Sequence, residues 1–148
     1  MASNLPPDPQ ATLAAINARG AVGLPALLGV TIIEVKPDGL VGRLAIRPDL
    51  LAPNGFLHAG TIVTLADTTC GYGTYLYLPP GAQSFTTIEL KTNFLGTARE
   101  GALRCDATLV HGGRTTQVWD AQVRDEATGR VIALFRCTQL LIYPQPDR

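Results

Sequence analysis

A chain of 148 residues is long enough for one domain with a sizeable core. Its side chains are 46% hydrophobic and 16% charged, and 12 basic side chains balance 12 acidic ones. This balance provides no global positive field to recruit nucleic acid or an anionic membrane surface. The first residues lack a secretory signal pattern, no run reaches the roughly 18 apolar residues of a membrane span, and the three cysteines form no CxxC pair. We therefore expect a cytoplasmic protein without a disulfide framework or a metal site.

The N-terminal residues predict a loose arm and a short helix. Residues 1–9 contain three prolines, and the Ala- and Leu-rich segment 10–28 is interrupted by glycines and a proline. We assign residues 1–24 to this arm and helix, and residues 25–148 to a single domain. Two runs rich in β-branched residues then flank the sequence "KPDG", whose turn chemistry predicts a β-hairpin, and the loop "DLLAPNGF" follows them.

A long helix is predicted from His58 to about Leu78. This segment contains no proline, and its apolar positions recur at helical spacing until a Pro-Pro-Gly sequence ends it. Polar and apolar residues then alternate with period two in four runs, near residues 85–95, 103–109, 114–124 and 131–143. One long helix facing about six antiparallel strands is an α+β plan in which a curved sheet wraps the helix and covers most of its sides.

Asp67 is an ionisable residue inside this apolar helix. It either points to solvent at a gap in the sheet, satisfies a backbone N–H in a loop, or does chemistry. A chemical partner exists at the helix start, where the first N–H groups lack intrahelical acceptors and the small residues Ala59 and Gly60 allow a carbonyl oxygen to approach. Asp67 lies roughly 12 Å further along the axis. The two groups therefore meet at one substrate only if the substrate spans this gap or the acid belongs to a neighbouring subunit.

Three stretches carry a family resemblance. "NGFLHAGTIVTLADTTCGYG", "TTIELKTNFLG" and "HGGRTTQVWDAQVRDEATGRVIA" resemble the hotdog-fold thioesterases of the PaaI-like group, and the similarity extends over residues 25–143. The resemblance implies the hotdog fold, in which one long central helix is wrapped by a curved antiparallel sheet. It also implies a homodimer, or a homotetramer built as a dimer of dimers, with active sites at the dimer interface. Helix start and acid would then come from different protomers.

Site residues follow from the same resemblance. The implied catalytic groups are the Asp67 carboxylate as nucleophile or general base, the Ala59 N–H as the donor to the thioester carbonyl, His58 and Gly60 beside it, and Thr87 as a group that orients water. The implied substrate-binding positions, several of them in segments that contact coenzyme A, are Asn54, Arg99, Gly112, Gly113, Arg114 and Thr115. Arginine suits this role because its planar fork binds two phosphate oxygens at once.

The chain departs from the family pattern at three positions. The usual Gly-Gly after the histidine is Ala59-Gly60, which retains the N–H donor. Ala52 stands where many members carry an Asn or Gln, and Asn54 is two residues out of register with that position. Gly71 stands where some members carry a Ser or Thr. The auxiliary groups of the mechanism are thus less well defined by the sequence than Asp67.

The function implied is hydrolysis of an acyl- or aryl-acyl-CoA thioester to the free acid and coenzyme A. No cofactor is expected, since coenzyme A is part of the substrate. The alternatives are a non-catalytic acyl-CoA binding module and a hotdog-fold acyl-thioester hydratase or dehydratase, although the hydratase pattern of an Asp followed five residues later by a His is missing. The side chains of Tyr72, Tyr75 and Phe85 either line the acyl pocket or belong to the core.

Overall fold

The computed structural model describes residues 5–145. Its helices are α1 (Pro9–Arg19), α2 (Gly23–Leu28) and α3 (Ala59–Leu76), with a 3-10 turn at Pro48–Leu50. Its strands are β1 (Thr31–Lys36), β2 (Gly39–Ala45), β3 (Ser84–Phe94), β4 (Ala102–Gly112), β5 (Thr116–Asp125) and β6 (Val131–Ile142). Within this part of the chain, no helix has the length and hydropathy needed to cross a membrane.

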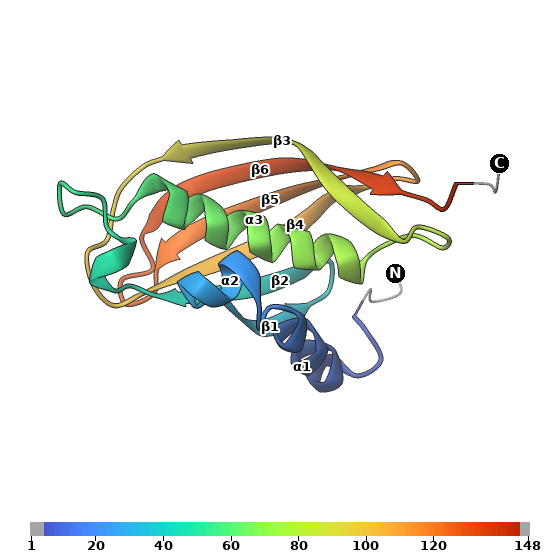
Figure 1. Ribbon diagram of the computed structural model, residues 1–148, viewed down its shortest axis with the longest axis horizontal. Coiled ribbons are helices and arrows are strands. Elements are labelled where there is room, and N and C mark those ends of the chain that lie inside the picture. The colour runs from blue at the N-terminus through green and yellow to red at the C-terminus, as the bar shows by residue number, and fades with distance from the viewer. Residues whose placement is uncertain (1–4, 146–148) are drawn as a thin grey trace.

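The strands form one six-stranded sheet in the order β1-β2-β4-β5-β6-β3, and every neighbouring pair is antiparallel. The sheet curves around α3, as Figure 1 shows. This architecture confirms the predicted α+β plan of one long helix and about six strands. β1 and β2 are joined by the predicted tight turn, in which Asp38 has a φ of 54°. Asp tolerates this left-handed conformation better than most residues because its short polar side chain can hydrogen-bond locally.

The C-terminal half of α3 lies very close to the sheet. A Cβ atom on Gly73 would be 2.4 Å from the ring of Trp119, so glycine is required for this approach. Trp119 is fully buried, and its indole N–H donates to Gln117 Oε1 at 2.9 Å. Gln117 in turn donates to the carbonyl of Tyr77 at 2.7 Å. This buried amide ties the end of α3 to β5 and so sets the position of the helix along the sheet.

The sheet leaves one face of α3 uncovered, which is consistent with the expectation that it covers most, and not all, sides of the helix. Ile62, Leu65, Ala66, Thr69 and Cys70 are buried against the strands, whereas residues on the opposite face are half-buried or exposed. Asp67 belongs to this uncovered face. Beside this face, α2 packs against α3 and α1 packs against β1 (Figure 1).

The N-terminal segment forms two helices where the sequence predicted one short helix. The chain leaves α1 at Gly20 and enters α2 at Gly23, which has a φ of 71°. α1 is fixed to β1 by the Asn17 side chain, which donates to the Ile32 carbonyl and accepts from the Ile32 N–H, both at 2.8 Å. This two-point contact holds the last turn of α1 near the uncovered face of α3.

Candidate functional site

The start of α3 presents one unused backbone donor. His58 is the N-cap, and its Nδ1 accepts the N–H of Gly60 at 2.8 Å. The N–H of Thr61 donates to the His58 carbonyl at 3.0 Å. Within residues 5–145, the N–H of Ala59 has no acceptor. The helix dipole adds partial positive charge at this point, so the Ala59 N–H is suited to bind a carbonyl oxygen.

A hollow of about 300 Å³ lies beside this donor. It is lined by Leu24 and Leu28 of α2, by His58 and Gly60, and by Thr64 one turn into α3. The helix start is anchored there because the hydroxyl of Thr61 donates to the carbonyl of Leu50 at 2.9 Å. Most of the lining is apolar. Aliphatic side chains therefore lie beside the Ala59 N–H and shield it in part from solvent.

Asp67 lies in a second hollow, of about 190 Å³. The side chain is half-buried, and its Oδ1 has no hydrogen-bond partner in the described part of the chain. Burial raises the pKa of Asp67 because the charged form loses hydration. The walls of the hollow are largely aromatic, and they include Tyr72, Tyr75 and Phe85. The Oδ1 atom is available as an acceptor, since no donor among the described residues reaches it.

Thr87 faces Asp67 from β3, so the structure brings these two predicted site residues together. The Thr87 hydroxyl donates to Gln139 Oε1 at 2.8 Å. Gln139 is fully buried, and its own amide donates to Cys137 Sγ at 3.3 Å. Because the hydroxyl proton of Thr87 is engaged, its oxygen offers only lone pairs to the hollow. Thr87 can therefore accept a hydrogen bond from a water molecule held near Asp67.

The helix start and Asp67 are separate within one chain. They line different hollows, and eight residues of α3 separate Ala59 from Asp67, which corresponds to roughly 12 Å along the axis. This length is too great for both groups to touch one thioester carbon. A single protomer thus contains both predicted catalytic groups, the Ala59 N–H and the Asp67 carboxylate, but does not bring them to one substrate atom.

The predicted substrate-binding residues lie at two ends of the sheet. Asn54 and Arg99 are near the helix start, where the Asn54 side chain accepts the Phe56 N–H at 3.2 Å and the Arg99 guanidinium lies 4.5 Å from the centre of the Phe56 ring. The turn Gly112–Thr115 lies at the other end, beside the finish of β6, since the Thr115 carbonyl accepts the Leu141 N–H at 2.9 Å (Figure 1). In one chain these two sets do not meet.

Two residues of the Asp67 region were not indicated as site residues by the sequence. Gln139 holds Thr87, and the signal that points to it is a polar residue at an inward position of an otherwise apolar alternation on β6. Arg19 lines the same hollow as Asp67 although it belongs to α1. No local pattern could indicate Arg19, because it reaches α3 only through the packing of the N-terminal segment.

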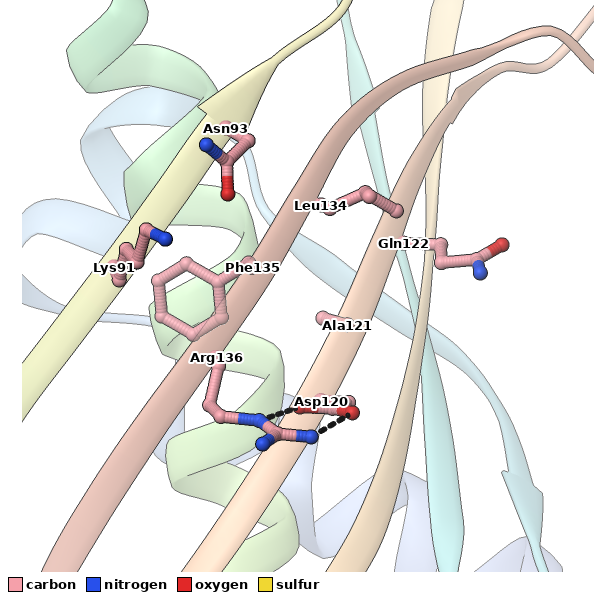
Figure 2. A pocket seen from close by; sticks show the side chains of 8 residues that line it. All are labelled: Lys91, Asn93, Asp120, Ala121, Gln122, Leu134, Phe135 and Arg136. Carbon is pink, nitrogen blue, oxygen red and sulfur yellow. Dashed lines mark hydrogen bonds and ion pairs between the residues drawn. The ribbon is translucent and has the colours of Figure 1, made fainter.

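The outer face of the sheet carries a larger hollow, of about 430 Å³, which Figure 2 shows. Asp120 and Arg136 lie there as an exposed ion pair, with Arg136 Nε 2.5 Å from Asp120 Oδ1. The side chains of this hollow include Lys91 and Gln122, which lie on the face of the sheet away from α3. Because an exposed and mutually neutralised pair supplies no activated group, this hollow is a poor candidate for an active site.

Cys70 lies one turn beyond Asp67 and is fully buried. Burial raises the pKa of its thiol well above the ordinary value, which keeps it protonated and unreactive. No group of three or more His, Cys, Asp or Glu side chains with metal-binding geometry occurs among residues 5–145. Asp67 is therefore the group in this region with the chemistry of a base or nucleophile.

Comparison with known proteins identifies the family and the fold of this chain. Residues 54–132 match the family described as the thioesterase superfamily. The chain is 30% identical over 117 residues to the 1,4-dihydroxy-2-naphthoyl-CoA hydrolase of Listeria monocytogenes, covering 79% of this chain and 94% of that protein. A mutant thioesterase PA1618 from Pseudomonas aeruginosa superimposes with a TM-score of 0.84 at 26% identity, covering 89% of this chain and 94% of that chain. The Escherichia coli PaaI protein superimposes with a TM-score of 0.74 at 22% identity, covering 88% and 96% of the two chains. These matches confirm the hotdog fold.

Proposed function

The chain belongs to the thioesterase superfamily, and on that premise we propose that it hydrolyses an acyl- or aryl-acyl-CoA thioester in the cytoplasm to the free acid and coenzyme A. The observation that supports this proposal most strongly is the environment of the Asp67 carboxylate. Its carboxylate is half-buried in an aromatic hollow, one of its oxygens lacks a partner among the described residues, and Thr87 faces it. A carboxylate kept in this state costs stability, which is the mark of a functional group.

The proposed reaction uses the protein's own groups. The thioester carbonyl oxygen accepts the Ala59 N–H, so the negative charge that develops on that oxygen during attack is stabilised by the helix start. Asp67 takes a proton from water as the water oxygen bonds to the carbonyl carbon. The intermediate then collapses, the carbon–sulfur bond breaks and the thiolate of coenzyme A leaves. Thr87 favours this base mechanism because its free lone pairs can orient the water.

Asp67 acting as the nucleophile is the other route. Its oxygen would bond to the carbonyl carbon, expel the thiolate and form an acyl–aspartyl anhydride, which water then hydrolyses. Both routes place the same two groups, Asp67 and the Ala59 N–H, on opposite sides of the substrate carbon. Neither route requires a metal or an organic cofactor.

The site is proposed to form between two copies of the chain. β3 is an edge strand, and Ile88, Leu90 and Phe94 are 57%, 42% and 47% exposed along it. An unpaired edge with exposed apolar side chains is typical of a surface that pairs with another strand. Antiparallel pairing of two β3 strands places the helix start of one protomer beside the Asp67 region of its partner. This arrangement resolves the separation of roughly 12 Å within one chain.

The same pairing supports the predicted coenzyme A contacts. Because the two protomers run in opposite directions along the shared edge, the end that carries Arg99 meets the partner's end that carries Gly112–Thr115. Arg99 and Arg114 would then hold the phosphates of coenzyme A from both protomers. A dimer of dimers is also proposed, because Leu134, Leu140 and Ile142 are exposed on the outer face of the sheet and offer a second apolar surface.

The test is thiol release from phenylacetyl-, hydroxybenzoyl-, hexanoyl- and palmitoyl-CoA by the wild type and by Asp67→Asn. We expect turnover by the wild type and a loss of about 10²-fold or more in the folded variant, the contribution of a positioned base. Acyl-CoA binding without thiol release by the wild type would instead indicate a binding module. Formation or loss of a double bond in the acyl chain would indicate a hydratase or dehydratase.

A further inference from the structure

The hollow around Asp67 adjoins another one, of about 300 Å³, between α1 and the C-terminal half of α3. The two hollows share three lining residues, Arg19, Tyr72 and Tyr75. The second hollow is otherwise lined by small and aliphatic groups, including Ala15, Ile16 and Leu76. A continuous path therefore leads from the Asp67 carboxylate along the uncovered face of α3 to the last turn of α1.

The walls of this path are shaped for a flat apolar group. Tyr75 and Phe85 pack edge to face, with ring centres 5.5 Å apart and ring planes at 75°. Tyr72 projects from the same face of α3. Burial raises the pKa of its phenol, an effect that the charge of Arg19 opposes, so the phenol remains a hydrogen-bond donor at neutral pH. Aromatic side chains in these arrangements bind a ring through stacking and edge contacts.

Arg19 lies where the two hollows meet, above Tyr75. Its guanidinium carbon is 3.8 Å from the centre of the Tyr75 ring, a cation–π contact that fixes the plane of the group. Within residues 5–145, the guanidinium forms neither an ion pair nor a hydrogen bond. Its N–H donors, five in a free guanidinium, are thus available to a ligand.

The spacing along α3 defines the size of that ligand. Tyr75 follows Asp67 by eight residues, which corresponds to roughly 12 Å along the helix axis. An acyl group whose carbonyl carbon is at Asp67 and whose far end lies over Tyr75, beside Arg19, therefore has the length of two fused rings or of a comparable chain.

We propose that Arg19 is a specificity-determining residue that binds an oxygen substituent, a hydroxyl or a carboxylate, at the far end of an aromatic acyl group. This inference rests on the proposed thioesterase function and adds the residue that selects the acyl group. α1 lies outside residues 54–132, the part of the chain that matches the superfamily, so this contact is supplied by the N-terminal segment. The Tyr75 ring packs against the face of the Arg19 guanidinium, and the oxygen substituent binds the N–H groups at the edge of the guanidinium.

The test compares 2-naphthoyl and 6-hydroxy-2-naphthoyl thioesters, each made with coenzyme A and with N-acetylcysteamine, which carries no phosphate. The enzymes are the wild type, Arg19→Gln, Arg19→Lys and the control Arg43→Gln, which removes an exposed arginine that is ion-paired with Glu126 on the sheet. We expect Arg19→Gln to lower kcat/KM for the hydroxylated acyl group by about 10- to 100-fold with either thiol, the effect of a hydrogen bond to a charged group. For the unsubstituted ring we expect kcat/KM to fall by less than about threefold.

Arg19→Lys should recover part of the loss, because it keeps the charge but not the planar fork. The proposal is overturned if Arg19→Gln leaves kcat/KM for the hydroxylated acyl group unchanged. It is also overturned if kcat/KM falls equally for both acyl groups as coenzyme A thioesters and for neither as N-acetylcysteamine thioesters. The second result would place Arg19 on a phosphate. A wild type that releases no thiol from any of the four thioesters would overturn the proposed function itself, which distinguishes the two failures. Thermal unfolding checks that each variant is folded.

Discussion

The Nδ1 atom of His58 accepts the backbone N–H of Gly60 at 2.8 Å, and this bond decides what each residue at the start of α3 can do. Because Nδ1 is the acceptor, the neutral ring carries its proton on Nε2. The bond also satisfies Gly60 and leaves the Ala59 N–H as the donor without an acceptor among the described residues. His58 is thus a capping residue that singles out one donor, and the predictions below separate that role from catalysis.

Ala59→Pro removes this donor with little other change. Proline is favoured at the first position of a helix, and His58, with φ −66° and ψ 135°, already has the conformation that a residue before proline requires. We expect kcat to fall by about 10²- to 10³-fold, the effect of losing one oxyanion donor. Ala59→Gly keeps the N–H and should retain most of the activity. Steady-state kinetics with an acyl-CoA, together with thermal unfolding of both variants, measures the difference; similar kcat values for the two would exclude the donor.

Mixing two inactive variants tests whether the site spans two protomers. When Asp67→Asn and Ala59→Pro chains are refolded together at equal concentration, half of the dimers are mixed, and each of these contains one site with an intact Asp67 and an intact Ala59. We expect recovery of about a quarter of the wild-type activity. The control is each variant refolded alone. No recovery, in a mixture that mass spectrometry shows to contain mixed dimers, would mean that both groups act within one chain.

His58→Ala should weaken the start of α3 without removing the chemistry. Loss of an N-cap costs about 1 kcal/mol in the free energy of unfolding. We expect His58→Asn to restore most of that stability, because Asn is among the best N-cap residues. Thermal unfolding measures both variants, and kcat should fall far less than in Ala59→Pro. A loss of kcat in His58→Asn as large as that in Ala59→Pro would contradict a capping role and assign the imidazole to catalysis.

The rate should depend on pH through Asp67. Burial raises the pKa of this carboxyl, and the base must be ionised to act, so kcat/KM should decline as pH falls through the raised pKa. The midpoint of this decline should lie above the ordinary Asp value of about 3.9. A pH profile of kcat/KM measures it, with thermal unfolding at each pH to exclude loss of the fold. A midpoint at or below the ordinary value would show that another group limits the rate.

The same carboxylate should reduce stability at neutral pH. When the folded pKa of an acid is above its unfolded pKa, the charged form disfavours folding, and the penalty disappears as pH falls through the folded pKa to below the unfolded one. We therefore expect Asp67→Asn to raise Tm at pH 7, on the order of 2 °C, and to have little effect near pH 3. Asp120→Asn, which removes an exposed carboxylate paired with Arg136, is the control. A lower Tm for Asp67→Asn at pH 7 would mean that the carboxylate is structurally satisfied.

The sequence predicts those features of this protein that depend on neighbouring residues. Period-two alternation and the turn residues indicated the strands to within a few residues, and the proline-free segment bounded by Pro-Pro-Gly indicated α3. Asp67 was visible as a candidate because a charge within an apolar helix is a local anomaly. The boundaries between α1 and α2 were less predictable, since glycine and proline interrupt a helix without showing how the chain resumes.

Tertiary structure alone decided which distant groups meet. Thr87 is held by Gln139, 52 residues away, because β3 pairs with β6 across the sheet order. Arg19 stacks on Tyr75 because Asn17 fixes α1 to β1 beside the uncovered face of α3. The sequence by itself determined the elements, the acid and the helix start, because helix and strand periodicity are set by a few bonds along the chain. Strand order, the uncovered face of α3 and the Arg19 contact depend on how the whole chain buries its apolar surface, and no local pattern encodes that.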